Sequence, residues 1–593
     1  MSKDRLSPLD ASFLHLEDGS SHMHVAAALL FAGRAPAYER LLDHIESRLG
    51  LVPRYRQRLA EVPLAQARPR WVDDDRFDLR YHVRHTALPE PGTEYELQVL
   101  AGRVFSQQLR RDRPLWELWL VSGLEGGRFA ILSKTHHALV DGVSGLDILS
   151  VLFAPDSEED GRPWQAKPSP SGAELVAEAL IERATSAGEL ARPLRAAARR
   201  PRAALSRLAE TAVGAGAMAW AGMQPAPPTP YNAQKVGPDR RFTWTRASLD
   251  DVKAIKNSLG GTVNDVVLTV VTLALRRHLE RRGEDIADLE LKAFIPVSVR
   301  AEDQRGTLGN QVSGMLATLP ISCSDPARCL ATISQQMRQV KDSGQAVGAQ
   351  ALTELTGFAP PTLIQQASRL VTRQRFVNLV VTNVPGPQFP LYLDGREMTD
   401  MFPMVPLGSN LNLGIAIVSY NGKLNFGLVG DFNALHDLED LAADFLAGLH
   451  ELAAVAGIET PEPGDDRPWP GYDDEPAAEI EAPAGRGRAA RQAGAVLRAR
   501  AQAPPRRVER HGAGAGRRRL TMAATEDELS FEIDVKPLSS PSATRRRCSS
   551  PSTSGTTRTS GSTPTGSCRR SKRAACRVTA RGPRTRSRSS AAG

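Results

Sequence analysis

The sequence predicts an α/β protein made of two halves, followed by a segment of different composition. Apolar runs of strand length alternate with amphipathic helical segments from residue 6 to about residue 457. An Ala-, Arg- and Leu-rich segment at 172–223 and the linker at 224–230 (QPAPPTP) separate the two halves. The predicted units are therefore residues 1–171, 172–230, 231–460 and 461–593, which agrees with a prior of ~100–200 residues per domain for a chain of 593 residues.

The first half contains strands that frame a helical segment. The patterns predict a strand at 25–31, a helix at 37–49, a helix at 97–109, a strand after the sequence PLWELW and a strand that carries His136 and His137. Trp116 and Trp119 in PLWELW are interpreted as packing anchors in the core.

The second half begins at Tyr231. Its patterns predict helices at 248–259, 266–278, 327–343 and 435–452, and strands around 242–244 and at 291–299, 376–384, 411–420 and 423–431. Thr262 is the expected N-cap of the helix that carries Asn264, with Asp265 as an acidic residue in its first turn. Asn421-Gly422 predicts a tight type I′ hairpin.

Charge is divided unevenly along the chain. Residues from Pro461 on contain 26 Lys and Arg against 14 Asp and Glu, a net charge of +12, whereas residues 1–460 carry −4. The formal net charge of +8 is thus no indication that the body binds nucleic acid. Five cysteines without metal-site spacing fit a reducing compartment. No N-terminal signal, no apolar run long enough to span a membrane and no Gly-rich phosphate loop is expected.

The centre of the predicted function is the stretch ILSKTHHALVDGVSGLDIL, residues 131–149. An apolar strand delivers His136 and His137, and Asp141-Gly142 follow before a predicted helix. Because adjacent side chains on a strand point to opposite faces, one histidine should lie inside, held by hydrogen bonds, and the other should face a substrate. The same alternation argues against a shared zinc ion, and His15, His22 and His24 do not suggest a metal site either.

The chemistry of these residue types suggests a general base. An imidazole that titrates near neutral pH can take a proton from a hydroxyl or an amine. Asp141 would either orient an imidazole or form a buried ion pair with an arginine, and Gly142 permits a sharp turn. A pair of histidines at a strand end could also be purely structural.

The pattern HHxxxDG resembles the signature of CoA-dependent and carrier-protein-dependent acyltransferases, and most closely that of the bacterial wax ester synthase/diacylglycerol acyltransferase family. Three further blocks are similar to that family: the N-terminal segment with Pro-x-Asp and Met-His-Val, the Pro-Leu-Trp at 114–116, and the Val-Asn-Asp at 263–265. The blocks occur in the family's order over residues 6–457.

The resemblance implies a two-lobed, chloramphenicol-acetyltransferase-like α/β fold with mixed sheets and the motif in a channel between the lobes. It implies esterification of a diacylglycerol or a long-chain alcohol by a fatty acyl-CoA, with acyl-CoA as co-substrate and no bound cofactor or metal. His137 would be the base, His136 would shape the motif, Asn264 would donate to the oxyanion, and Asp141 would pair with Arg300 or another arginine. The alternatives are a carrier-protein-linked or condensation-type enzyme and a lipid-binding scaffold without catalysis.

The sequence leaves the roles of two segments open. The basic helical part at 192–207 could lie on an anionic membrane surface, or it could be a crossover helix whose arginines face water. The resemblance implies a cytoplasmic protein in peripheral contact with the plasma membrane or lipid droplets. The tail at 461–593 is expected to be disordered, since it has few aromatic residues and high charge, and it resembles either a basic RNA-binding tail or the product of an out-of-frame reading.

Overall fold

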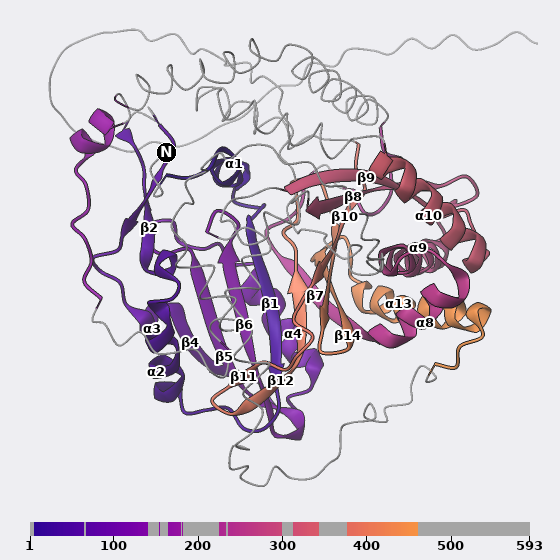
Figure 1. Cartoon of the computed structure of the whole chain (residues 1–593), viewed down its shortest axis with the longest axis horizontal. Helices are drawn as coiled ribbons and strands as arrows, with labels where there is room; N and C mark the ends of the chain where they lie inside the picture. The colour runs from indigo at the N-terminus through magenta and orange to yellow at the C-terminus, as the bar shows by residue number, and fades with distance from the viewer. Residues whose placement is uncertain are drawn as a thin grey trace, which may run out of the picture. The chain divides into compact units, whose positions relative to one another are not determined.

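The computed structural model describes residues 5–63, 67–139, 153, 164–178, 181, 225–232, 235–298, 312–342 and 376–460. Nearly all strands within these ranges belong to two six-stranded mixed sheets (Figure 1). The basic segment 192–207 and the tail 461–593 lie outside the described residues, so the expectations about them stay predictions.

The first sheet is formed mainly by the N-terminal half, with the strand order β11-β12-β1-β6-β5-β4. Its β4 and β5 are parallel, and the other neighbours are antiparallel. The strands are β1 (His24–Phe31), β4 (Val83–Ala87), β5 (Trp116–Leu124), β6 (Arg128–His136), β11 (Tyr392–Leu393) and β12 (Arg396–Met404). A separate two-stranded sheet joins β2 (Gln57–Ala60) and β3 (Arg70–Asp73).

The second sheet is formed by the C-terminal half, with the order β7-β14-β13-β10-β8-β9. Here β10 is parallel to both β13 and β8, and the remaining pairs are antiparallel. The strands are β7 (Arg240–Ser248), β8 (Glu290–Ser298), β9 (Val312–Pro320), β10 (Leu379–Pro385), β13 (Leu413–Tyr420) and β14 (Lys423–Asp431).

Helices cover the outer faces of both sheets. The second sheet packs against α8 (Leu249–Leu259), α9 (Val263–Arg281), α10 (Pro326–Asp342) and α13 (Leu438–Ala456), with which it shares one core (Figure 1). The outer core of the first sheet includes residues of α1 (Pro8–Leu16), α2 (Tyr38–Leu49) and the 3-10 turn η1 (Pro53–Arg56). The short helix α3 (Leu79–His82) precedes β4, and the turn η3 (Glu125–Gly127) links β5 to β6.

A third core lies between the two sheets and includes α4 (Glu94–Phe105). The alternation of side chains along the strands assigns residues to it. In β1, Ala26, Ala28 and Leu30 join this core, whereas Ala27 and Leu29 join the outer core. The even-numbered residues of β6 that lead to His136 therefore face the space between the sheets.

One strand is exchanged between the halves. β12 belongs to the C-terminal half of the chain, yet it pairs with β1 in antiparallel fashion, with Ala28 opposite Phe402. β11 then extends the same sheet. β12 also lies close to β14 of the second sheet, so this segment connects the two sheets. The division into units 1–171 and 231–460 that the sequence predicts does not include this exchange.

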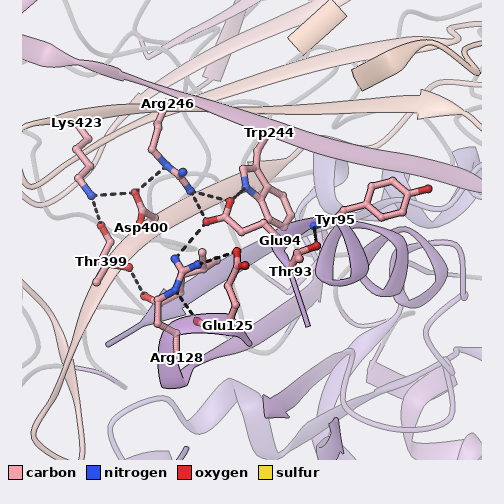
Figure 2. Close-up of polar contacts among 11 residues, drawn as sticks. Thr93, Glu94, Tyr95, Glu125, Arg128, Trp244, Arg246, Thr399, Asp400 and Lys423 are labelled. Atoms are coloured by element: carbon pink, nitrogen blue, oxygen red, sulfur yellow. Dashed lines mark hydrogen bonds and ion pairs between the residues drawn. The ribbon is translucent and has the colours of Figure 1, made fainter. Parts of the chain in front are cut away.

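A polar cluster joins elements of both sheets at the start of α4 and β6 (Figure 2). Glu94 accepts hydrogen bonds from Trp244 Nε1 at 2.7 Å and Arg246 Nη2 at 2.9 Å, both on β7. Arg246 also lies 3.4 Å from Asp400 on β12, and Lys423 on β14 lies 3.1 Å from the same carboxylate. Arg128 at the start of β6 also donates to the carboxylate of Glu94, at 3.2 Å.

Several local predictions are confirmed. Thr262 caps α9 in a reciprocal capping box with Asp265, and Asn421-Gly422 forms the tight turn between β13 and β14, with φ of 43° and 81°. The predicted helix at 97–109 instead begins at Glu94, because Thr93 and Glu96 form a capping box there. The predicted two-lobed α/β architecture with mixed sheets is confirmed.

Candidate active site

The apolar strand β6 places His136 at its last position. His136 lies opposite His24 of β1, and its backbone N–H donates to the carbonyl of Leu115 at 3.0 Å. The strand ends there, because Leu139 N–H closes a turn onto the carbonyl of His136 at 2.9 Å. His137 therefore belongs to the turn and not to the strand.

His136 is held inside the protein, as predicted. The residue is 1% exposed, and its Nδ1 accepts a hydrogen bond from the backbone N–H of Ala138 at 3.0 Å. A neutral imidazole whose Nδ1 accepts must carry its proton on Nε2. That nitrogen lies 3.7 Å from Oε1 of Glu17, which is within ion-pair distance but too long for a hydrogen bond.

Glu17 is the buried acid beside the histidine pair. It is the C-cap residue of α1, and its side chain is 1% exposed. Its carboxylate accepts from Arg111 Nη2 at 2.8 Å and Nε at 3.1 Å, and from the backbone N–H of Met23 at 3.2 Å. Burial by itself would raise the pKa of the Glu17 carboxyl, but His136 and Arg111 outweigh it and hold this pKa below its usual range.

His137 is fixed by its backbone and by ring stacking. Its N–H donates to the carbonyl of Met23 at 2.9 Å, and its ring stacks on Phe13 of α1 with centroids 4.7 Å apart. The residue is fully buried, and its predicted presentation to a substrate stays a prediction.

The other residues of the motif cannot be placed. Asp141, Gly142 and Arg300 lie outside the described residues, so the expected ion pair of Asp141 stays a prediction.

Asn264 lies in the first turn of α9, in the second half of the chain. It is buried, and its Oδ1 accepts from Nδ2 of Asn383 on β10 at 3.4 Å. This bond directs the oxygen of Asn264 toward Asn383, so the amide donors of Asn264 point elsewhere. The described contact of Asn264 is with Asn383 and not with either histidine, so its expected role as an oxyanion donor stays a prediction.

The surroundings of His136 contain further buried polar groups. Lys134, two residues before it on β6, is fully buried and lies 3.3 Å from Glu117 of β5. His24 Nε2 lies 2.7 Å from the carbonyl of Phe105, and burial followed by the charge of Lys134 lowers the pKa of His24 well below its usual value. His22 stacks on His24, with ring centroids 5.8 Å apart. No group of three potential ligands for a metal occurs among the described residues.

The tryptophans of PLWELW have different environments. Trp116 is a core residue, as predicted: it is 1% exposed, donates from Nε1 to the carbonyl of Tyr55 and stacks on His82. Trp119 is only partly buried, and the guanidinium of Arg84 lies over its ring.

Comparison with known proteins assigns the family. The wax ester synthase/diacylglycerol acyltransferase catalytic domain matches residues 6–267, and the C-terminal domain of the same family matches residues 308–453. The chain belongs to the wax ester synthase/diacylglycerol acyltransferase family. It is therefore an acyltransferase, which confirms the resemblance seen in HHxxxDG and the three accompanying blocks.

Individual relatives agree with this assignment. A Mycobacterium tuberculosis protein named as a candidate diacylglycerol O-acyltransferase is 35% identical over 461 residues, which is 76% of this chain and 90% of the relative. A second protein of that species, named a probable diacylglycerol O-acyltransferase, is 34% identical over 77% of this chain and its own full length. The solved wax ester synthase/diacylglycerol acyltransferase from Marinobacter aquaeolei VT8 is 28% identical, with a TM-score of 0.55, and covers 77% of this chain and 100% of that chain.

In the described ranges, no single helix has both the length and the apolar character needed to cross a membrane. The successive helices α8 and α9 meet these requirements only as a pair, and they bend by 100° at their junction.

Proposed function

We propose that this chain transfers a fatty acyl group from acyl-CoA to the free hydroxyl of a diacylglycerol and forms a triacylglycerol. Long-chain alcohols are a second class of acceptor, which would give wax esters. The names of the relatives support the first acceptor, and the family name supports both. Acyl-CoA is the co-substrate in this proposal.

The reaction proceeds through His137 as general base. Its imidazole takes the proton of the acceptor hydroxyl while the oxygen attacks the thioester carbonyl. The tetrahedral intermediate collapses with cleavage of the carbon–sulfur bond, and the imidazolium returns the proton to the leaving thiolate. The products are the ester and free CoA, with no acyl-enzyme. Asn264 donates to the oxyanion in this scheme, and Asp141 has a structural role.

The observation that carries this proposal is the fixed position of His137. Its backbone is bound to Met23 and its ring is stacked on Phe13, so the base loses little freedom when a substrate arrives. Because the ring is buried, the acceptor hydroxyl has to enter the protein interior, where exclusion of water protects the thioester from hydrolysis.

Contact with a lipid surface follows from the substrates, since diacylglycerol resides in membranes and triacylglycerol in lipid droplets. The chain is proposed to act from the cytoplasm in peripheral contact with such a surface, with the arginines at 192–207 as the binding segment. Binding to anionic vesicles should then weaken as salt is raised. Binding that persists at 1 M salt would contradict the electrostatic part of this proposal.

The decisive experiment incubates the full chain with palmitoyl-CoA and a panel of acceptors: dioleoylglycerol, hexadecanol, glycerol and no acceptor. Products are separated by chromatography, and released thiol is measured in parallel. Ester formation with dioleoylglycerol is expected, and His137→Ala should reduce it by about 10²–10⁴-fold. The matched control is His85→Ala, an exposed histidine of the same lobe, which should retain activity. A His137→Ala variant with wild-type turnover would overturn the assigned base, and a wild type that esterifies no acceptor would overturn the function.

A further inference from the structure

Glu17 contacts the histidine pair by two separate routes. The first passes through the side chain of His136, whose Nε2 lies 3.7 Å from the carboxylate and whose Nδ1 accepts the Ala138 N–H. The charge of Glu17 thus favours the tautomer with the proton on Nε2, which is the tautomer that leaves Nδ1 able to hold the turn after His137.

The second route passes through a single peptide. Glu17 accepts the N–H of Met23 at 3.2 Å, and the carbonyl of the same residue accepts the N–H of His137 at 2.9 Å. Glu17 therefore holds the residue that holds the backbone of the proposed base. Arg111 keeps the carboxylate in place with two hydrogen bonds at 2.8 Å and 3.1 Å.

We propose that Glu17 is a positioning residue for acyl transfer, which fixes the imidazole of His136 and the backbone of His137 at once. It touches neither of the reacting atoms in this scheme. The inference rests on the proposed role of His137 as base and adds the acid that orients it.

The test uses two substitutions in the full chain. Glu17→Gln keeps the size of the side chain and removes its charge, whereas Glu17→Asp keeps the charge and shortens the reach by one methylene. Both should lower kcat by roughly 10–100-fold, since a displacement of about 1 Å at a reacting group can cost 10²-fold, and KM for palmitoyl-CoA should change little. Melting temperature, measured in parallel, reports whether each variant folds.

The pH profile separates the effect of charge from that of geometry. Among the described residues, the charged and titratable groups of this site are Glu17, His136, Arg111 and the adjoining His137, with His22 and His24 within the field of Glu17. Lys134 acts on His22 and His24 and is itself paired with Glu117. Only one of these changes in each variant. Activity should fall at acidic pH as the proposed base, His137, takes up a proton. Loss of the negative charge in Glu17→Gln should move this acidic limb of the kcat/KM profile to lower pH, because the imidazolium of His137 is then less stabilised. Glu17→Asp should leave that limb in place.

The chain contains a matched control. Asp437, on the turn before α13, is also a carboxylate that contacts an arginine and a histidine. Arg282 Nε donates to it at 2.8 Å, and His278 Nε2 lies 3.0 Å away. Asp437→Asn should lower the melting temperature and leave kcat and the acidic limb unchanged.

The outcomes are distinguishable. If His137→Ala is inactive while folded Glu17→Gln keeps wild-type kcat and an unshifted limb, the inference about Glu17 is wrong and the proposed base stands. If kcat of the Glu17 variants falls only in proportion to their folded fraction, as for Asp437→Asn, Glu17 is merely structural. If His137→Ala keeps full activity, the proposed mechanism fails first.

Discussion

Arg246 on β7 donates two hydrogen bonds to the carboxylate of Glu94 at the start of α4, at 3.0 Å and 2.9 Å (Figure 2). The two residues are 152 positions apart and come from different halves of the chain. Arg128 at the beginning of β6 donates to the same carboxylate at 3.2 Å. Because β6 is nine residues long and ends at His136, this contact lies roughly 25 Å from the histidines along the strand.

Glu94→Gln should therefore weaken the contact between the halves without touching the chemistry. The expected loss is about 1.5–3 kcal/mol in the free energy of unfolding, the range for hydrogen bonds to charged groups. Denaturant titration measures it, and a double-mutant cycle with Arg246→Gln isolates the pair. Glu39→Gln is the control, because Glu39 and Arg80 also form a pair with two hydrogen bonds, but this pair is exposed and lies within one lobe. Equal effects of the two substitutions would contradict a bridging role for Glu94.

Gly427 on β14 packs directly against the backbone of β12. A Cβ at this position would lie 1.8 Å from the carbonyl oxygen of Pro403 on β12. Gly427→Ala should thus separate β14 from β12 and cost at least about 1–3 kcal/mol, as for other overpacked cores. Gly19→Ala is the matched control, since its Cβ would meet nothing within 4 Å. Thermal unfolding of both variants tests the prediction, and equal melting temperatures would refute it.

His82 should make the stability of the fold depend on pH. Burial lowers the pKa of His82 to about 4, whereas an unfolded histidine titrates near 6.5. The unfolded chain then binds more protons between these values, so this contribution is fully present above about pH 6.5 and is lost as the pH falls toward 4. Its size is on the order of 3 kcal/mol, at about 1.4 kcal/mol per pKa unit.

Equilibrium unfolding between pH 4 and pH 7 measures this effect. His82→Phe keeps a ring to stack on Trp116 and removes the titrating group, so its stability should fall less steeply over this window. His85→Phe, at an exposed position on the following strand β4, should keep the wild-type slope. Parallel curves for wild type and His82→Phe would assign the pH dependence to other groups.

The body of the enzyme should function without its tail. The described structure ends at Thr460, four residues after α13, and Gly457 closes that helix in the left-handed conformation, with φ of 72°. A chain that ends at Thr460 should stay soluble and keep its turnover with palmitoyl-CoA, and only its non-specific binding to anionic surfaces should decrease. Loss of turnover with an unchanged melting temperature would make residues 461–593 part of the enzyme.

Local signals allowed much of this structure to be predicted from sequence. The capping box of Thr262 and Asp265, the Asn421-Gly422 turn and the strand before His136 each depend on residues a few positions apart. The motif and its three accompanying blocks were sufficient to predict the family.

Contacts between residues far apart in the sequence could not be predicted from such local signals. The pairing of β12 with β1 joins residues more than 360 positions apart, and nothing in the apolar pattern of either strand selects its partner. The proposed role of Glu17 was missed for the same reason, although its place within the family-like N-terminal block was a usable signal. The burial of His137 could not be predicted either, because the ring that stacks on it, Phe13 of α1, lies more than 120 residues earlier in the sequence.

The exchanged strand β12 also determines when the first sheet can be completed during translation. β1 leaves the ribosome early, but the edge that β12 covers stays unpaired until the chain has reached Met404, which takes roughly 20–75 s at typical rates of translation. During that interval the nascent N-terminal half presents an open strand edge of the kind that recruits other chains. The first lobe therefore cannot mature before the second has been made, and a polypeptide limited to residues 1–171 should depend on chaperones or aggregate.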